Sequence, residues 1–191
     1  MLKKQSRSFI ARFVISAVLL VTFVNPYIES SEYRNALVFM FSHYALFIAG
    51  FVITYGIVKT PRLAMLPVSI VSVYWHLPIP FALSGALPFF RLIEELSLFT
   101  AGLVAGSAVN SLSSKAKSAL LGLWVLADTG LSVMFLVLPR IYSHAAIPLS
   151  PYPPFQFVML GIAMVFFMNV VVAFVVYSHV RHIGAILREP I

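Results

Sequence analysis

The sequence predicts an all-α, polytopic membrane protein: one bundle of six transmembrane helices over residues 1–191, with the N-terminus and the C-terminus both cytoplasmic. Hydrophobic residues make up 61% of the chain and charged residues only 10%, whereas a soluble domain has about 45–50% and about 25%. Six apolar stretches approach or exceed the roughly 20 residues that a helix needs to cross the hydrocarbon core. Lys and Arg are unevenly divided between alternate connections, which indicates a fixed orientation.

The six predicted spans follow one another with short breaks, at residues 9–24, 36–57, 65–85, 92–111, 118–139 and 155–179. Turn-forming residues mark the breaks, among them Asn25-Pro26, Pro61, Pro88 and the Pro-rich run 148–154. Basic residues precede the first span, as in a secretory signal, but no small-residue cleavage pattern follows Val24. We therefore expect the first helix to be retained. The alternating pattern of a membrane β-barrel is missing.

The orientation follows from the positive-inside rule. With the N-terminus in the cytoplasm, ten basic residues lie on the inner side and three on the outer side. The inner ten are Lys3, Lys4, Arg7, Arg12, Lys59, Arg62, Lys115, Lys117, Arg181 and Arg188, and the outer three are Arg34, Arg91 and Arg140. The net charge of +7 is thus assigned to lipid headgroups in the cell (plasma) membrane, and nucleic acid is excluded as a partner because the basic residues form no run.

Ionisable side chains inside the bilayer are the candidate functional residues, because each costs about 2.5–3.5 kcal/mol at the centre of a helix. Glu29 and Glu32 fall in the first outer loop, and Glu189 in the tail, where we expect them to be solvated. The span directions place His43, His76 and the pair Glu94-Glu95 at one depth near the outer surface. Three separate helices therefore bring ligand-type side chains to one layer.

The residue types in this layer favour a metal site. Met40 and His43 are three residues apart and share a helix face; thioether with imidazole suits copper, and imidazole with carboxylate suits zinc, copper or iron. The predicted ligands are His43, His76, Glu95 and Met40. Supporting or alternative residues are Glu94, Arg91, Tyr44 and Asp128.

Other roles are open for each of these residues. Methionine commonly fills membrane cores, and the histidines could bond to neighbouring helices. A carboxylate in the first turn of a helix is favoured by the helix dipole and could pair with Arg91. One of Glu94 and Glu95 faces the bundle, and the sequence leaves open which one.

Asp128 lies apart from this layer, in the middle of the fifth span. It could be a neutral, hydrogen-bonded core acid, a proton-relay element or a partner of Asn169. Two further motifs concern the helices themselves. Pro78 and Pro80 break the third span directly after His76, as in helices that line a site. Gly102-x-x-x-Gly106 predicts a close helix contact.

Three segments, in order, resemble CtaG-type cytochrome c oxidase assembly factors: Met40-Phe-Ser-His43, Trp75-His-Leu-Pro78 and Leu92-Ile-Glu-Glu-Leu-Ser-Leu-Phe-Thr-Ala-Gly-Leu103. The likeness covers residues of about 36–170 and includes Leu149-Ser-Pro-Tyr-Pro-Pro before the last span. A closer resemblance, without a known activity, is to uncharacterised archaeal six-helix membrane proteins with Asn-Pro-Tyr after the first helix. The chain departs from the CtaG pattern: Glu95 and Phe39 stand where that family has histidine, the final Asp-Gln is absent, and about one helix is missing.

The resemblance implies a metal-handling protein that supplies copper during assembly of a haem–copper oxidase. One alternative is an accessory subunit of a respiratory membrane complex, with or without a haem b held by the two histidines. Another is a small transporter or proton-conducting protein that works through Asp128. We expect no enzyme, because the sequence contains no Walker loop, dinucleotide-binding motif, metallopeptidase motif or nucleophile elbow.

Overall fold

The computed structural model describes residues 2–186, and the side chains of residues 9–177. These residues form helices and short connections, without a strand. The basic residues counted above at positions 3, 4, 7, 181 and 188 lie outside the described side chains. The elements are α1 (Leu2–Phe23), α2 (Pro26–Glu32), α3 (Ala36–Thr54), η1 (Arg62–Ala64), α4 (Met65–Trp75), α5 (Pro78–Ala86), α6 (Pro88–Ala108), η2 (Val109–Ser111), α7 (Ser114–Val137), η3 (Pro139–Tyr142) and α8 (Pro154–Ile186).

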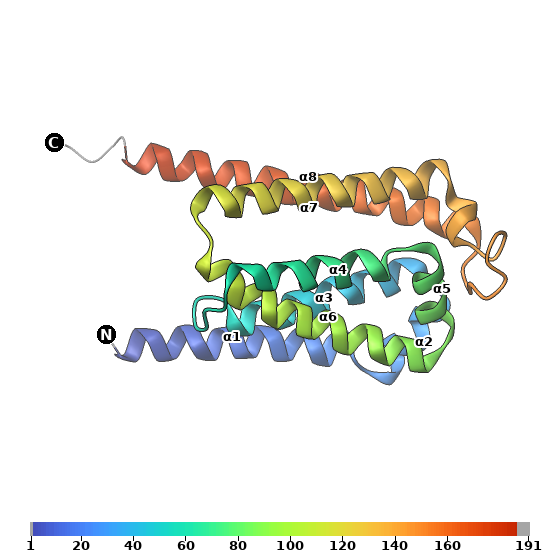
Figure 1. Ribbon diagram of the computed structural model, residues 1–191, viewed down its shortest axis with the longest axis horizontal. Coiled ribbons are helices and arrows are strands. Elements are labelled where there is room, and N and C mark those ends of the chain that lie inside the picture. Colours follow the sequence, from blue (N-terminus) through green and yellow to red (C-terminus); the bar gives the residue numbers. More distant parts are fainter. Residues whose placement is uncertain (1, 187–191) are drawn as a thin grey trace.

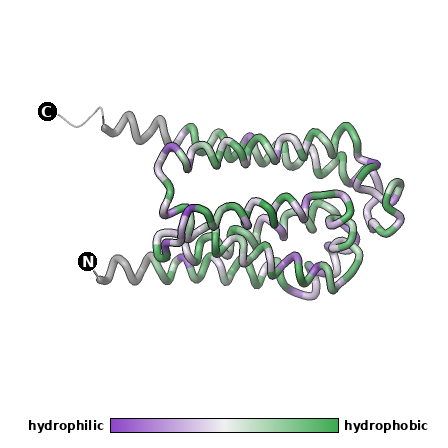
Figure 2. Tube along the Cα trace, in the orientation of Figure 1, coloured by the Kyte–Doolittle hydropathy of each residue, from purple (hydrophilic) through white to green (hydrophobic). Residues whose placement is uncertain are grey.

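Four helical segments are long and apolar enough to cross a membrane: Ala36–Thr54, Pro88–Ser111, Ser114–Val137 and Pro154–Tyr177. Two further candidates are bent pairs, Phe9–Phe23 with α2 at 59° and Arg62–Trp75 with α5 at 72°, so the described residues hold up to six spans. Both bends lie at one end of the bundle, and α1 begins and α8 ends at the other (Figure 1). Apolar residues run along the helices, and many hydrophilic ones gather near the two ends (Figure 2).

The segment after the first span is a helix, not the predicted loop. The Asn25 side chain accepts hydrogen bonds from the backbone amides of Tyr27 and Ile28, both at 3.1 Å, and Pro26 occupies the first helical position. Both features favour the start of a helix. The resulting helix, α2, packs against α3 and ends at Glu32, which is buried. Glu32 was predicted to be solvated, and that prediction is wrong because a helix with a buried face replaces the loop.

The third span is broken where the prolines predict it. Helix α4 ends at Trp75, and α5 begins at Pro78, which has no amide hydrogen to continue the helix. His76 lies in this break, and the Tyr142 hydroxyl donates a 2.9 Å hydrogen bond to its carbonyl oxygen. A side chain from η3 thus satisfies one of the carbonyl groups that the break exposes.

Helix α3 lies at the centre of the bundle, in contact with α1, α2, α6 and α8. It meets α6 through glycine: a Cβ atom on Gly102 would overlap the Phe47 carbonyl, and one on Gly106 would overlap the Phe51 carbonyl. Gly50 of α3 is similarly close to α6. These positions confirm the close contact predicted from the Gly102-x-x-x-Gly106 motif.

Helices α7 and α8 run side by side as a separate pair (Figure 1). The pair joins the rest of the bundle mainly where α8 packs on α3. At the end that carries α2 and α5, aromatic rings from several elements form one core cluster: Phe39, Phe81, Phe135, Tyr142, Tyr152 and Phe157.

Candidate functional site

Three consecutive residues of α3 each contact an acid from a different helix. Successive residues of an α-helix point about 100° apart, so this triplet reaches three neighbours at nearly one depth. The hydroxyl of Ser42 donates to Glu32 of α2, the imidazole of His43 contacts Glu94 of α6, and the hydroxyl of Tyr44 donates to Asp128 of α7 at 2.6 Å.

His43 and Glu94 form a deeply buried contact, with exposed fractions of 4% and 1%. Nδ1 of His43 donates to the Phe39 carbonyl oxygen at 2.5 Å, so Nε2 carries the lone pair of the neutral ring. Nε2 contacts Oε1 of Glu94, and the pair must therefore share one proton. Oε2 of Glu94 is buried without a hydrogen-bond partner, an arrangement that leaves a free acceptor inside the bundle.

His76 lies next to this pair. The ring centroids of His43 and His76 are 6.1 Å apart. Nδ1 of His76 donates to the Ser72 carbonyl oxygen at 2.5 Å, as His43 does to a carbonyl four residues upstream. Within the described part of the chain, Nε2 of His76 has no hydrogen bond. Both rings thus use Nδ1 for a backbone carbonyl; Nε2 of His43 contacts Glu94, and Nε2 of His76 is the nitrogen without a partner among the described residues.

The structure places Glu94, not Glu95, beside His43. Glu95 is only half-buried, because the 100° step between adjacent residues turns it away from the bundle. His43 thus contacts Glu94 and lies beside His76, whereas the sequence predicts Glu95 as the ligand. Among the described residues these side chains do not form a three-residue group at metal-ligand spacing.

Arg91 and Glu32 form a buried ion pair beside this site, which sequence reasoning missed. The guanidinium lies 2.9 Å from a Glu32 carboxylate oxygen, and the Arg91 side chain is 4% exposed. It also donates to backbone carbonyls of α2 and α5: Glu29 at 3.1 Å, Ser84 at 3.2 Å and Gly85 at 3.1 Å. Arg91 therefore ties α2 and the end of α5 to α6. The signal in the sequence is an acid and an arginine assigned to one membrane face.

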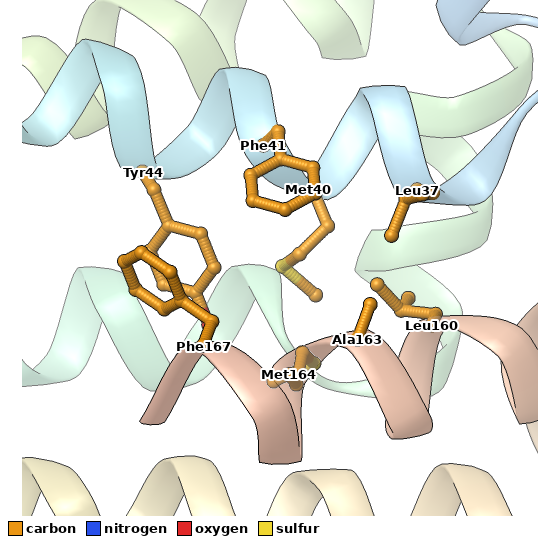
Figure 3. Close-up of a pocket in the computed structure, with 8 residues that line it drawn as sticks. All are labelled: Leu37, Met40, Phe41, Tyr44, Leu160, Ala163, Met164 and Phe167. Carbon is orange, nitrogen blue, oxygen red and sulfur yellow. The ribbon is translucent and has the colours of Figure 1, made fainter. Parts of the chain in front are cut away.

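Met40 does not face Glu94 as His43 does. It lines a narrow apolar pocket between α3 and α8 (Figure 3). Its thioether points toward Met164 (Figure 3). Asp128 bonds to Tyr44, whereas the Asn169 amide donates to the Val165 carbonyl of its own helix at 2.7 Å. The suggested Asp128–Asn169 pair is therefore wrong, and Met40 faces apolar side chains.

A family model described as "Protein of unknown function (DUF1404)" matches residues 14–182 of the chain. The chain belongs to this family. Comparison with curated proteins and with solved structures finds no match. The segment matched by the DUF1404 model contains the three acids, the α3 triplet, His76 and Arg91 described above. The DUF1404 match gives neither a CtaG-type relative nor an archaeal source, and both remain predictions.

Proposed function

We propose that this DUF1404 protein is a membrane metal-binding protein, which holds a transition-metal ion through His43, His76 and Glu94 near the outer face of the plasma membrane. Following the CtaG resemblance, the metal is copper, and its recipient is a haem–copper oxidase during assembly. The protein itself carries out no catalysis in this proposal.

The observation that carries the proposal is the common orientation of the two imidazoles. Each Nδ1–H donates to a backbone carbonyl four residues upstream. A hydrogen bond from the second ring nitrogen is the usual support of a metal-binding histidine, because it fixes the ring and its tautomer. In two such rings 6.1 Å apart, Nε2 of His76 has no partner among the described residues, and Nε2 of His43 is directed at the Glu94 carboxylate.

Glu94 supplies the third donor and fits the same group. Its Oε2 atom is buried and has no partner, and its Oε1 atom shares a proton with His43. Metal ligands must be deprotonated, so a bound ion would take the place of that proton. Among the described residues no three His, Asp or Glu side chains already stand at metal-site spacing; the proposal therefore requires His76 and Glu94 to draw together around the ion.

The proposed topology has six spans, with the site at the outer end. In support, the bends that lead into α2 and α5 lie at one end of the bundle, and α1 begins and α8 ends at the opposite end (Figure 1). The positive-inside rule counts Lys and Arg and not net charge. It therefore gives the orientation derived from the sequence, with Arg34, Arg91 and Arg140 on the outer side.

The alternative of a haem b between the histidines has less support. The rings of Phe81 and Phe39 lie beside His43, with centroids 6.3 Å and 4.3 Å from the imidazole, so aromatic side chains occupy space that a porphyrin ring next to His43 would need. An accessory subunit without a cofactor remains the second candidate. Its supporting observation is that each histidine already bonds within the bundle.

Metal content tests the proposal directly. We expect purified wild-type protein to hold close to one copper, zinc or iron per chain by elemental analysis, and His76→Ala and Glu94→Gln to lose most of it. The matched controls are His144→Ala, an exposed histidine in the connection before α8, and Glu95→Gln. Both should retain the metal.

Two results would contradict the proposal. One is wild-type protein that takes up no metal from copper or zinc solution. The other is equal loss of metal in the control variants. In either case a strain lacking the gene should still assemble its oxidase, and the accessory-subunit candidate would take precedence.

A further inference from the structure

Asp128, the third acid that the triplet contacts, lies well inside the candidate span formed by α7. From Ser114 to Asp128 the helix rises about 21 Å, and from Asp128 to Val137 about 14 Å, at 1.5 Å per residue. The carboxyl group faces α3, and the residue is 7% exposed. Asp128 is therefore remote from both ends of α7, and nearer to the Val137 end.

The surroundings of this carboxyl group contain one polar partner. Oδ1 accepts the 2.6 Å hydrogen bond from Tyr44, and Oδ2 is buried without a partner. Tyr44 of α3 is its titratable partner among the described residues. The described side chains of α8 include no ionisable group apart from Tyr177, and the charged residues of α7 other than Asp128, Lys115 and Lys117, lie at its first turn. The Ser132 hydroxyl bonds to the Asp128 backbone carbonyl, not to its carboxyl group.

This environment selects the ligand that the carboxyl group can take. An uncompensated charge at this depth costs several kcal/mol, and a metal cation needs more oxygen ligands than a carboxyl group and a phenol provide. Apolar residues fill the space beside Tyr44, among them Phe41 and Phe167, whose ring stacks on Tyr44 at 5.7 Å. A proton satisfies Asp128 without further ligands.

We infer that Asp128 is a reversible proton-binding site in the membrane, with Tyr44 as the positioning residue that holds its carboxyl group. Binding converts the carboxylate to the neutral acid, and release returns the proton to the aqueous phase. The inference does not depend on metal binding by His43, His76 and Glu94.

The site also links two parts of the bundle. Tyr44 belongs to the central helix and Asp128 to the α7–α8 pair, so the hydrogen bond between them crosses from one to the other. Loss of the proton places a charge at this contact. Protonation is thus coupled to how closely the α7–α8 pair packs on α3.

Infrared difference spectroscopy of the protein in liposomes tests the inference, because the carbonyl band of a protonated carboxyl group disappears when the proton leaves. We expect one such band to be lost as the pH is raised from about 5 to about 10 and to be absent from Asp128→Asn. Asparagine keeps an oxygen for Tyr44, so this variant should fold. Tyr44→Phe should lose the band at a higher pH, because the carboxylate then lacks the hydroxyl that stabilises it.

Glu94→Gln and His76→Ala serve as the second set of variants. They should keep the Asp128 band, including its dependence on pH, even where they abolish metal binding. A band that persists at every pH would show a permanently protonated structural acid, and a titrating band that survives in Asp128→Asn would assign the proton elsewhere. Either result overturns the inference and leaves the metal proposal standing.

Discussion

Gly102 of α6 lies directly against the Phe47 carbonyl of α3, farther along the two helices that join His43 to Glu94. The backbones can approach this closely only because Gly102 has no Cβ atom. The separation of α3 and α6, on which the contact between the His43 imidazole and the Glu94 carboxylate depends, is therefore set by a glycine that lies away from these two side chains.

Gly102→Ala should destabilise the protein, because the new methyl group would overlap the Phe47 carbonyl and force the helices apart. Overpacking of this kind costs about 1–3 kcal/mol. Gly122→Ala is the control, since nothing lies within 4 Å of a Cβ atom at that position, and alanine favours a helix over glycine. Thermal unfolding in detergent should show a lower midpoint for Gly102→Ala and an equal or higher one for Gly122→Ala.

Arg91→Met should be among the most damaging single substitutions, because it leaves the Glu32 carboxylate buried without its cation. Removing one partner of a buried pair costs about 3–5 kcal/mol. The double variant Arg91→Met with Glu32→Gln should recover part of the loss, and Arg140→Met, at an exposed arginine, should change little. Thermal midpoints in one detergent compare all three; equal midpoints for Arg91→Met and Arg140→Met would contradict the role of the ion pair.

Stability should fall in alkali through two tyrosines at the end of the bundle that carries α2 and α5. Burial raises the pKa of Tyr142 and that of Tyr152, so both stay protonated in the folded protein where the unfolded chain ionises. Their contribution is complete below the unfolded pKa of about 10 and is lost as the pH rises toward the folded pKa values. Unfolding midpoints should drop above about pH 10, less so in Tyr142→Phe and Tyr152→Phe; Tyr27→Phe, at an exposed tyrosine, should behave as the wild type.

The proposed orientation can be tested with single cysteines, since the natural chain has none. Ala146→Cys should react with an impermeant maleimide on intact cells, whereas Ser114→Cys should react only after the membrane is opened. Both positions are exposed. Ser143, in the same outer segment as Ala146, is fully buried and unsuitable. Labelling of Ser114→Cys alone on intact cells would invert the topology and place the histidines toward the cytoplasm.

The sequence predicted the helical class, the break after His76 and the shared depth of His43, His76 and a glutamate. These features follow from hydropathy, from proline and from the fixed rise of a helix. The direction in which a side chain points around its helix axis was harder to predict. The choice between Glu94 and Glu95, and the side of α3 that carries Met40, depend on which neighbour packs where, and one sequence does not contain that information.

Glu32 escaped prediction for a different reason. The segment 25–35 carries four polar or charged residues in a row, Glu29, Ser30, Ser31 and Glu32, which resembles a solvated loop. The Asn25 cap and Pro26 were available as signals of a helix start, but burial of Glu32 depends on Arg91, 59 residues later in the chain. The ion pair is a tertiary contact that local patterns do not predict.

The three bonds from Ser42, His43 and Tyr44 restrict what α3 can do. A rotation of this helix about its axis, or a slide by one residue, would break all three bonds together and leave Glu94 and Asp128 without a side-chain partner in an apolar interior. These bonds therefore fix the rotation and the register of helix α3 relative to its neighbours. Any movement that opens a path to the histidines must come from parts that leave its register unchanged, such as a hinge at the α4–α5 break or a tilt of the α7–α8 pair about the Tyr44 hydroxyl.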